Sequence, residues 1–157
     1  MTLYAAEVEV LRDLAAQVDE LLAGGLPQHG ADPVRDRLFP RAYLDPTEDE
    51  AETEFQAMVH ADLVRTKGEA VAALVASLDG GRERRGNVLE VRLDPEQVAQ
   101  WVGALNDLRL ALGVALGVAE EMPEVAPEDP RAPGLELYGW LTYLQGELVE
   151  QLLGEDG

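Results

Sequence analysis

The segment from residue 95 to about residue 118 is apolar on every side of a predicted helix, and it constrains the fold more than any other stretch. Trp101 and Leu112 belong to one face of it, and small or branched apolar residues fill the opposite face. A helix that is apolar all round lies either at the centre of a bundle or across a membrane. Asp107 and Arg109 at mid-segment would each cost about 2.5–3.5 kcal/mol inside a bilayer. We therefore expect this helix to be the buried centre of a helical fold with no membrane association.

Three further stretches carry apolar residues at three- and four-residue spacing, the period of an amphipathic helix. Gly24 and Gly25 end the first, since glycine readily adopts the left-handed conformation at a helix C-terminus. Thr47 and Glu50 form a capping box at the start of the second. Asp94 caps the third helix in chain order, which is the central segment that begins at residue 95. The predicted helices cover residues 3–23, 48–78, 95–118 and 135–153.

The second predicted helix carries an apolar stripe that we expect to be buried along its whole length. Residues 79–86 then form a predicted loop, and residues 88–93 alternate apolar and polar, which indicates a short half-buried strand. That strand needs a partner, either the extended segment Thr2–Tyr4 or the same strand of a second copy. The stripe consists of Phe55, Val59, Leu63, Ala70, Leu74 and Leu78.

These elements predict a mainly α, four-helix bundle-like single domain over residues 1–157, with a buried central third helix and one short β-strand. A length of 157 residues suits one domain, and a hydrophobic content of 46% supports a packed core. The residues expected to anchor that core are Trp101, Leu105 and Leu112 of the third helix, with Phe39 and Tyr43 of the preceding long loop.

The net charge of −19 is the most unusual bulk property of the chain. It repels phosphate backbones, so nucleic-acid binding is unlikely despite the arginines between residues 82 and 92. The same charge suits a basic protein partner or simple solubility. The N-terminal residues have neither a basic nor an apolar targeting region, so we expect a cytoplasmic protein.

Few residues could carry chemistry. The chain has no cysteine, which excludes disulfides and thiolate sites, and Ser77 is its only serine, inside a leucine-rich helix. His29 and His60 are isolated, and no glycine loop has nucleotide-binding spacing. We therefore predict no metal and no cofactor. Acid–base catalysis by carboxylates stays open, although the pattern favours a protein that is not an enzyme.

Polar residues on the central helix are the remaining candidates for a site. Asn106, Asp107 and Arg109 lie near the core, where each needs a partner. We expect Asp107 to accept hydrogen bonds from Arg37, Arg41 or the backbone of the long loop, and Arg109 to meet a carboxylate of the second or fourth helix. The favoured interpretation is a structural network that docks the loop on the helix. The alternative is a ligand site lined by the same residues.

Three segments resemble an uncharacterised actinobacterial family that is known only as a domain of unknown function. They are the central Trp101–Gly113, the loop segment Arg37–Tyr43 and the late segment Tyr138–Gln145, and the similarity covers nearly the whole chain. Members of that family are small acidic helical proteins, often encoded near the adaptor of the Clp protease. The resemblance therefore implies a link to regulated proteolysis.

Two functions from different classes follow. The favoured one is a non-enzymatic protein-interaction or regulatory module, with a protein partner and a homodimer as one form of that partnership. The alternative is a small-molecule-binding or enzymatic site at the loop–helix junction around Asp107 and Arg109.

Overall fold

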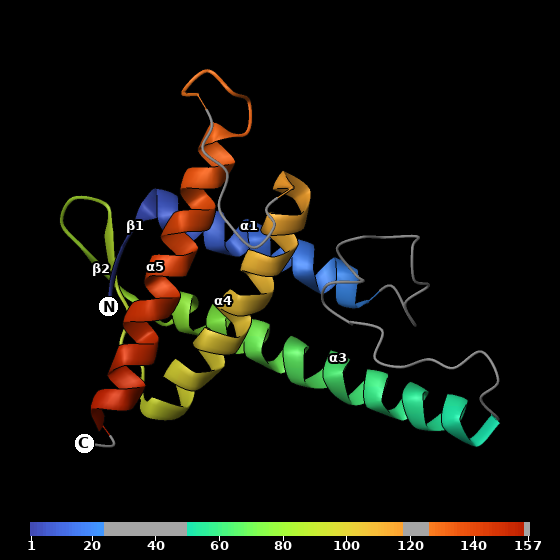
Figure 1. Ribbon diagram of the computed structural model, residues 1–157. Coiled ribbons are helices and arrows are strands. Elements are labelled where there is room, and N and C mark those ends of the chain that lie inside the picture. Colours follow the sequence, from blue (N-terminus) through green and yellow to red (C-terminus); the bar gives the residue numbers. More distant parts are fainter. Residues whose placement is uncertain (24–49, 118–125, 156–157) are drawn as a thin grey trace.

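Figure 1 shows the computed structural model, which describes residues 1–23, 50–117 and 126–155, with the side chains of residues 50–53 and 56 excepted. The fold is mainly α, as predicted from the periodicity. Phe39, Tyr43, Arg37, Arg41 and the capping residue Thr47 lie outside the described residues. The elements in chain order are β1 (Thr2–Tyr4), α1 (Ala5–Leu22), α3 (Glu50–Asp79), β2 (Arg82–Arg84), β3 (Val88–Glu90), α4 (Pro95–Leu116) and α5 (Ala132–Glu155).

Helix α4 lies at the centre of the described elements. Asp94 accepts a hydrogen bond from the Gln97 amide at its start, and Gly117 ends it in the left-handed conformation with φ 73°. Helices α5 and α3 make its main contacts (Figure 1), and its Trp101 is fully buried. Burial on every side was nevertheless a wrong prediction, because Gly103 is exposed and Leu110 only half-buried.

A three-stranded antiparallel sheet closes one end of the protein, in the order β1-β3-β2. Leu3 of β1 lies opposite Leu89 of β3, which confirms the predicted pairing within the chain. Two predictions were wrong. The first helix begins at residue 5, because residues 2–4 are extended, and β2 lies in the segment that we expected to be a loop. A single predicted strand is thus a sheet of three, turned at Gly86 and Asn87, whose φ angles are positive.

The buried side chains form one cluster to which β1, α1, α3, α4 and α5 all contribute. Of the predicted anchors, Trp101 and Leu105 are fully buried, and Leu112 is half-buried and packed against the cluster. The largest fully buried side chains are those of Trp101, Leu3, Leu11, Leu74, Leu78, Leu105, Leu108, Leu141 and Leu148.

Helix α3 is buried over only its second half. Leu74 and Leu78 are in the core, as expected, whereas Phe55, Val59 and Leu63 are exposed, so the prediction of a continuously buried stripe was wrong. The physical reason is length. A helix of 30 residues is about 45 Å long. Helix α1 runs alongside its second half and α4 crosses it, and its first half extends beyond both (Figure 1).

Candidate functional site

A buried ion pair joins α3 to α4 where the two helices cross. The Lys67 ammonium donates to Asp107 Oδ1 over 2.8 Å, and only 4% of the Asp107 side chain is exposed, against 20% for Lys67. Burial raises the pKa of the Asp107 carboxyl, and the hydrogen bond and positive charge of Lys67 oppose that rise. Our expectation that Asp107 meets Arg37 or Arg41 missed this partner, because nothing in the sequence shows which turn of α3 crosses α4.

Arg109 and Asn106 lie beside this pair without joining it. Arg109 Nη2 donates to Asn106 Oδ1 on the same helix over 3.4 Å, which is a weak hydrogen bond. The expected carboxylate partner for Arg109 is not found in the described part of the chain. Arg109 Nε and Trp101 Nε1 are buried there without a hydrogen-bond partner. The three polar residues predicted to form one network thus separate into an interhelical ion pair and a contact within one helix.

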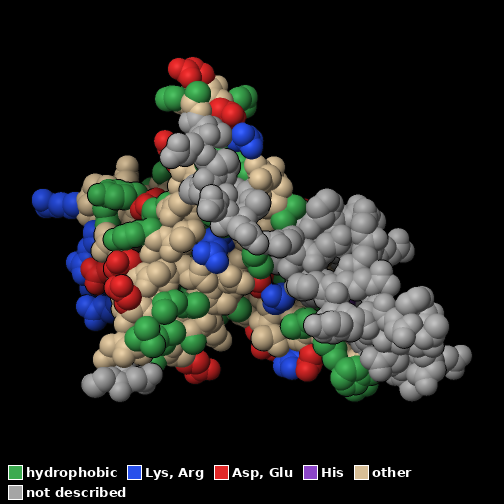
Figure 2. Space-filling view, in the orientation of Figure 1, with side chains coloured by type: hydrophobic (Ala, Val, Ile, Leu, Met, Phe, Trp, Pro, Cys, Tyr) green, Lys and Arg blue, Asp and Glu red, His purple; other side chains and the backbone are tan. Residues whose placement is uncertain are grey.

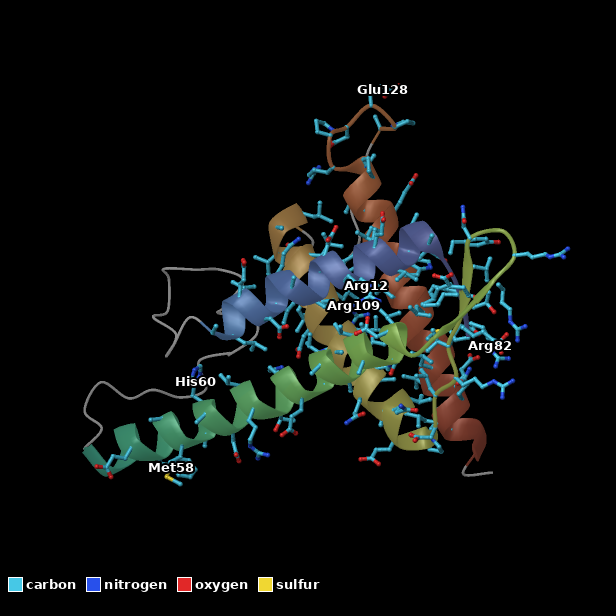
Figure 3. All side chains as sticks on the ribbon, turned by 180° about the vertical axis from the view of Figure 1, so that it is seen from behind. Arg12, Met58, His60, Arg82, Arg109 and Glu128 are labelled. Atoms are coloured by element: carbon cyan, nitrogen blue, oxygen red, sulfur yellow. The ribbon has the colours of Figure 1, made fainter. Side chains whose placement is uncertain are left out.

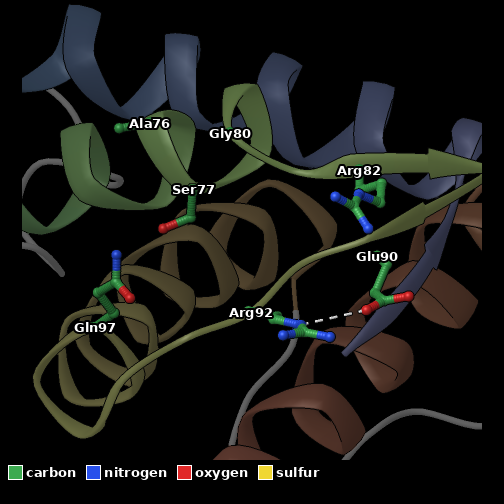
Figure 4. A pocket seen from close by; sticks show the side chains of 7 residues that line it. All are labelled: Ala76, Ser77, Gly80, Arg82, Glu90, Arg92 and Gln97. Atoms are coloured by element: carbon green, nitrogen blue, oxygen red, sulfur yellow. Dashed lines mark hydrogen bonds and ion pairs between the residues drawn. The ribbon is translucent and has the colours of Figure 1, made fainter.

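Two hollows in the described part of the chain lie at the sheet, away from Asp107. The first, of about 400 Å³, opens between the end of α3, the sheet and the start of α4 (Figure 4). The second, of about 450 Å³, lies by α1 and includes Arg12 and Asp79, which form an ion pair. Neither is lined by Asn106, Asp107 or Arg109, so neither supports the ligand site that we considered there.

Arginines gather on the outer face of the sheet, around Glu90. Arg84 Nε lies 3.0 Å from one Glu90 carboxylate oxygen, and Arg92 Nε lies 3.4 Å from the other. The hydrogen bond and charge of Arg84, followed by those of Arg92, lower the pKa of Glu90. Arg82 lines the first of the two hollows, as do Glu90 and Arg92 (Figure 4). Glu90 pairs with two of these arginines and balances one of the positive charges of the cluster.

The first half of α3 presents large apolar side chains to solvent. We call Phe55, Met58, Val59 and Leu63 the outer face of α3. Met58 is the most exposed of them at 71%, and Phe55 follows at 58%. Figure 3 shows Met58 on the side of α3 that points away from the rest of the protein, and apolar side chains surface there in Figure 2.

Acidic residues flank the outer face of α3. Glu54 and Asp62 lie four positions before and after Met58, on the same side of the helix. Arg65 pairs with Asp62 over 3.0 Å and with Glu69 over 3.5 Å, so this surface keeps a net negative charge. Periodicity identified Phe55, Val59 and Leu63 but not Met58, and it predicted the three to be buried.

The described residues contain no group of three or more histidines or carboxylates that could hold a metal ion. Among the same residues, no helix combines the length and hydropathy that crossing a membrane requires.

Known proteins place the chain in a family. The domain of unknown function DUF2017 matches residues 1–152. The oxidative stress regulator AosR of Mycobacterium tuberculosis is 32% identical over 162 residues, covering 91% of this chain and 71% of the regulator, and the Mycobacterium bovis protein of that name matches equally well. The putative AosR of Mycobacterium leprae is 31% identical, over 90% of this chain and 70% of its own length. No solved structure matches. The resemblance noted from the sequence is therefore confirmed, and the chain belongs to the DUF2017 family.

Proposed function

We propose that this protein is a non-enzymatic regulatory module that acts by binding a protein partner through the outer face of α3. The observation that carries this proposal is the exposure of Phe55, Met58, Val59 and Leu63 on one stretch of helix. Single exposed apolar residues are ordinary, but a contiguous group on a helix that extends past its neighbours is typical of an interaction surface. The relatives named as regulators support a regulatory role.

The spacing and charge of this surface specify the kind of partner. Phe55, Val59 and Leu63 follow each other at four-residue intervals, the pattern by which an amphipathic helix docks in an apolar groove. The stretch from Phe55 to Leu63 is about 12 Å long, which is enough for three anchors. The flanking Glu54 and Asp62, with the net charge of −19, favour a groove bordered by lysine or arginine.

The name of the relatives suggests the process. Because they are called oxidative stress regulators, we propose that this protein acts in the response to oxidants. The link to regulated proteolysis remains a separate part of the proposal. It requires that a captured partner be degraded at a different rate in cells that lack this protein.

The alternative of a ligand or enzymatic site around Asp107 and Arg109 receives less support. Lys67 already occupies Asp107 at 2.8 Å, and the two hollows lie elsewhere. We propose that Asp107 and Lys67 hold α3 against α4, which keeps the first half of α3 extended away from the core. The ion pair would then support the interaction surface from behind.

The test uses the full chain as bait in lysate of its host. The variant Phe55→Ser/Val59→Ser removes two apolar anchors of the outer face, and the matched control Tyr143→Ser/Leu153→Ser removes two side chains of similar exposure on α5. We expect the control to retain the captured protein and the α3 variant to lose it, with both melting temperatures close to the wild type. The same contrast is expected for survival in hydrogen peroxide when each variant complements a deletion strain. Equal capture by both variants would refute the proposal.

A further inference from the structure

We propose that Met58 is a reversible oxidation site, and that its sulfoxide weakens the outer face of α3. This inference rests on the proposed function, because it adds a means of regulation to the surface described above. The oxidant is a hydroperoxide of the hydrogen peroxide class.

The composition of the chain leaves methionine as its main reversible oxidation chemistry. The sequence has no cysteine, so thiol oxidation is excluded, and three methionines remain. Met1 is half-buried, and Met122 lies outside the described residues. Met58 is 71% exposed and lies on the part of α3 that extends past α1 and α4 (Figure 3). Its thioether is thus open to a small oxidant in solution without any opening of the fold.

The reaction is a two-electron oxidation that balances with one peroxide. A lone pair on the Met58 sulfur attacks one oxygen of hydrogen peroxide, an S–O bond forms, and the O–O bond breaks. The other oxygen leaves as water after proton transfer, so the sulfur is oxidised and the peroxide is reduced. Methionine sulfoxide reductases reverse the change, with a dithiol supplying the two electrons and the oxygen leaving as water.

The position of Met58 explains how this change would act. Met58 lies one helical turn after Phe55 and directly before Val59, so it belongs to the apolar contact area. Oxidation converts a flexible apolar side chain into a polar one, which loses the gain from burial against a partner. An interface that loses the burial of one methionine side chain is expected to bind its partner more weakly, by roughly ten-fold or more. The fold should not change, because the Met58 side chain is exposed and is not part of the core.

The first measurement follows oxidation itself. The full chain is treated with graded hydrogen peroxide, and peptide mass spectrometry gives the rate of sulfoxide formation at Met58. We expect a rate within about three-fold of that of free methionine, and an oxidised protein whose melting temperature lies within about 1 °C of the untreated one. The variant Met58→Leu, treated identically, controls for oxidation elsewhere. A rate at least ten-fold below that of free methionine would overturn the inference.

The second measurement connects oxidation to binding. Untreated wild type, peroxide-treated wild type and peroxide-treated Met58→Leu serve as baits, and the readout is the host protein that Phe55→Ser/Val59→Ser fails to capture. We expect the treated wild type to lose that protein at least ten-fold, Met58→Leu to keep it, and treatment with methionine sulfoxide reductases A and B to restore it. Equal capture by treated and untreated wild type would overturn the oxidation site while leaving the interaction surface standing. Capture that does not depend on Phe55 and Val59 would refute the interaction surface, and the oxidation site with it.

Discussion

Replacing Lys67 by methionine tests the role of the buried ion pair most directly. Methionine keeps much of the apolar stem of lysine but removes the charge, so the Asp107 carboxylate is left with 4% of its side chain exposed and no cation. Breaking a buried pair from one side typically costs about 3–5 kcal/mol of unfolding free energy.

The structure also sets an upper limit on that loss. An unpaired buried carboxylate can escape its cost by binding a proton. At pH 7, which is about 3 pH units above the ordinary pKa of an aspartate, protonating the carboxylate costs about 1.4 kcal/mol for each unit. The loss for Lys67→Met at pH 7 is therefore capped near 4 kcal/mol, a large share of the roughly 5–15 kcal/mol of a typical domain.

The stability lost in Lys67→Met should depend on pH. Burial already raises the pKa of Asp107 in the folded protein, and Lys67 opposes the rise. A carboxyl with a raised folded pKa costs no stability below its unfolded pKa, costs progressively more as pH rises from the unfolded to the folded pKa, and costs a constant amount above that. Without Lys67 the pKa rises further, so the defect of Lys67→Met should shrink as the pH falls from 7 to 5.

Urea denaturation of the wild type and Lys67→Met at pH 7 and pH 5 measures both quantities. The matched control is Arg12→Met, which breaks the exposed Arg12–Asp79 pair, whose side chains are 40% and 62% exposed. Its loss should stay within about 1 kcal/mol at both pH values. A Lys67→Met loss no larger than that of Arg12→Met, or one that grows toward pH 5, would refute a buried ionised Asp107 held by Lys67.

Three further outcomes are expected. Trp101→Ala should lower the unfolding free energy by about 3–5 kcal/mol in a thermal melt, since Trp101 is fully buried, and an unchanged melt would contradict the central position of α4. Gly113→Val should cost about 1–3 kcal/mol, because a side chain there would come within 3.0 Å of Tyr138, whereas Gly103→Val has open space and should cost nothing. Arg109→Met should cost less than about 1 kcal/mol in urea, because it removes one weak 3.4 Å hydrogen bond and a buried Nε without a partner; a larger loss would show that Arg109 has a stronger partner than Asn106.

The local features of the fold were predictable from the sequence because they depend on nearby residues. Asp94 caps α4 as predicted, and Trp101 is buried because its helix has few polar positions. By contrast, Arg82–Arg84 has no apolar alternation. It is a strand only because the turn at Gly86 brings it beside β3. The sequence of the segment by itself does not predict that pairing.

The candidate site depended on tertiary geometry and was predicted only in part. Asp107 was identified as a polar residue in need of a partner, but Lys67 is 40 positions earlier and becomes its partner only through the crossing of two helices. Likewise, Phe55 and Leu74 belong to one periodic stripe, yet Leu74 is fully buried and Phe55 is exposed. A stripe in the sequence records which side of a helix is apolar, and the lengths and crossing points of the neighbouring helices decide how much of it is covered.

The pairing of β1 with β3 has a consequence for how the protein is made. Leu3 leaves the ribosome before its partner Leu89, which follows only after α1 and α3 have been synthesised. At about 5–20 residues per second, β1 waits several seconds with both edges unpaired. Contacts between such distant parts of a chain form slowly, because a long loop must close first. The start of the chain is therefore committed to its place only once the β2–β3 hairpin has emerged, and a nascent chain halted before residue 88 would expose an apolar strand to the folding machinery of the cell.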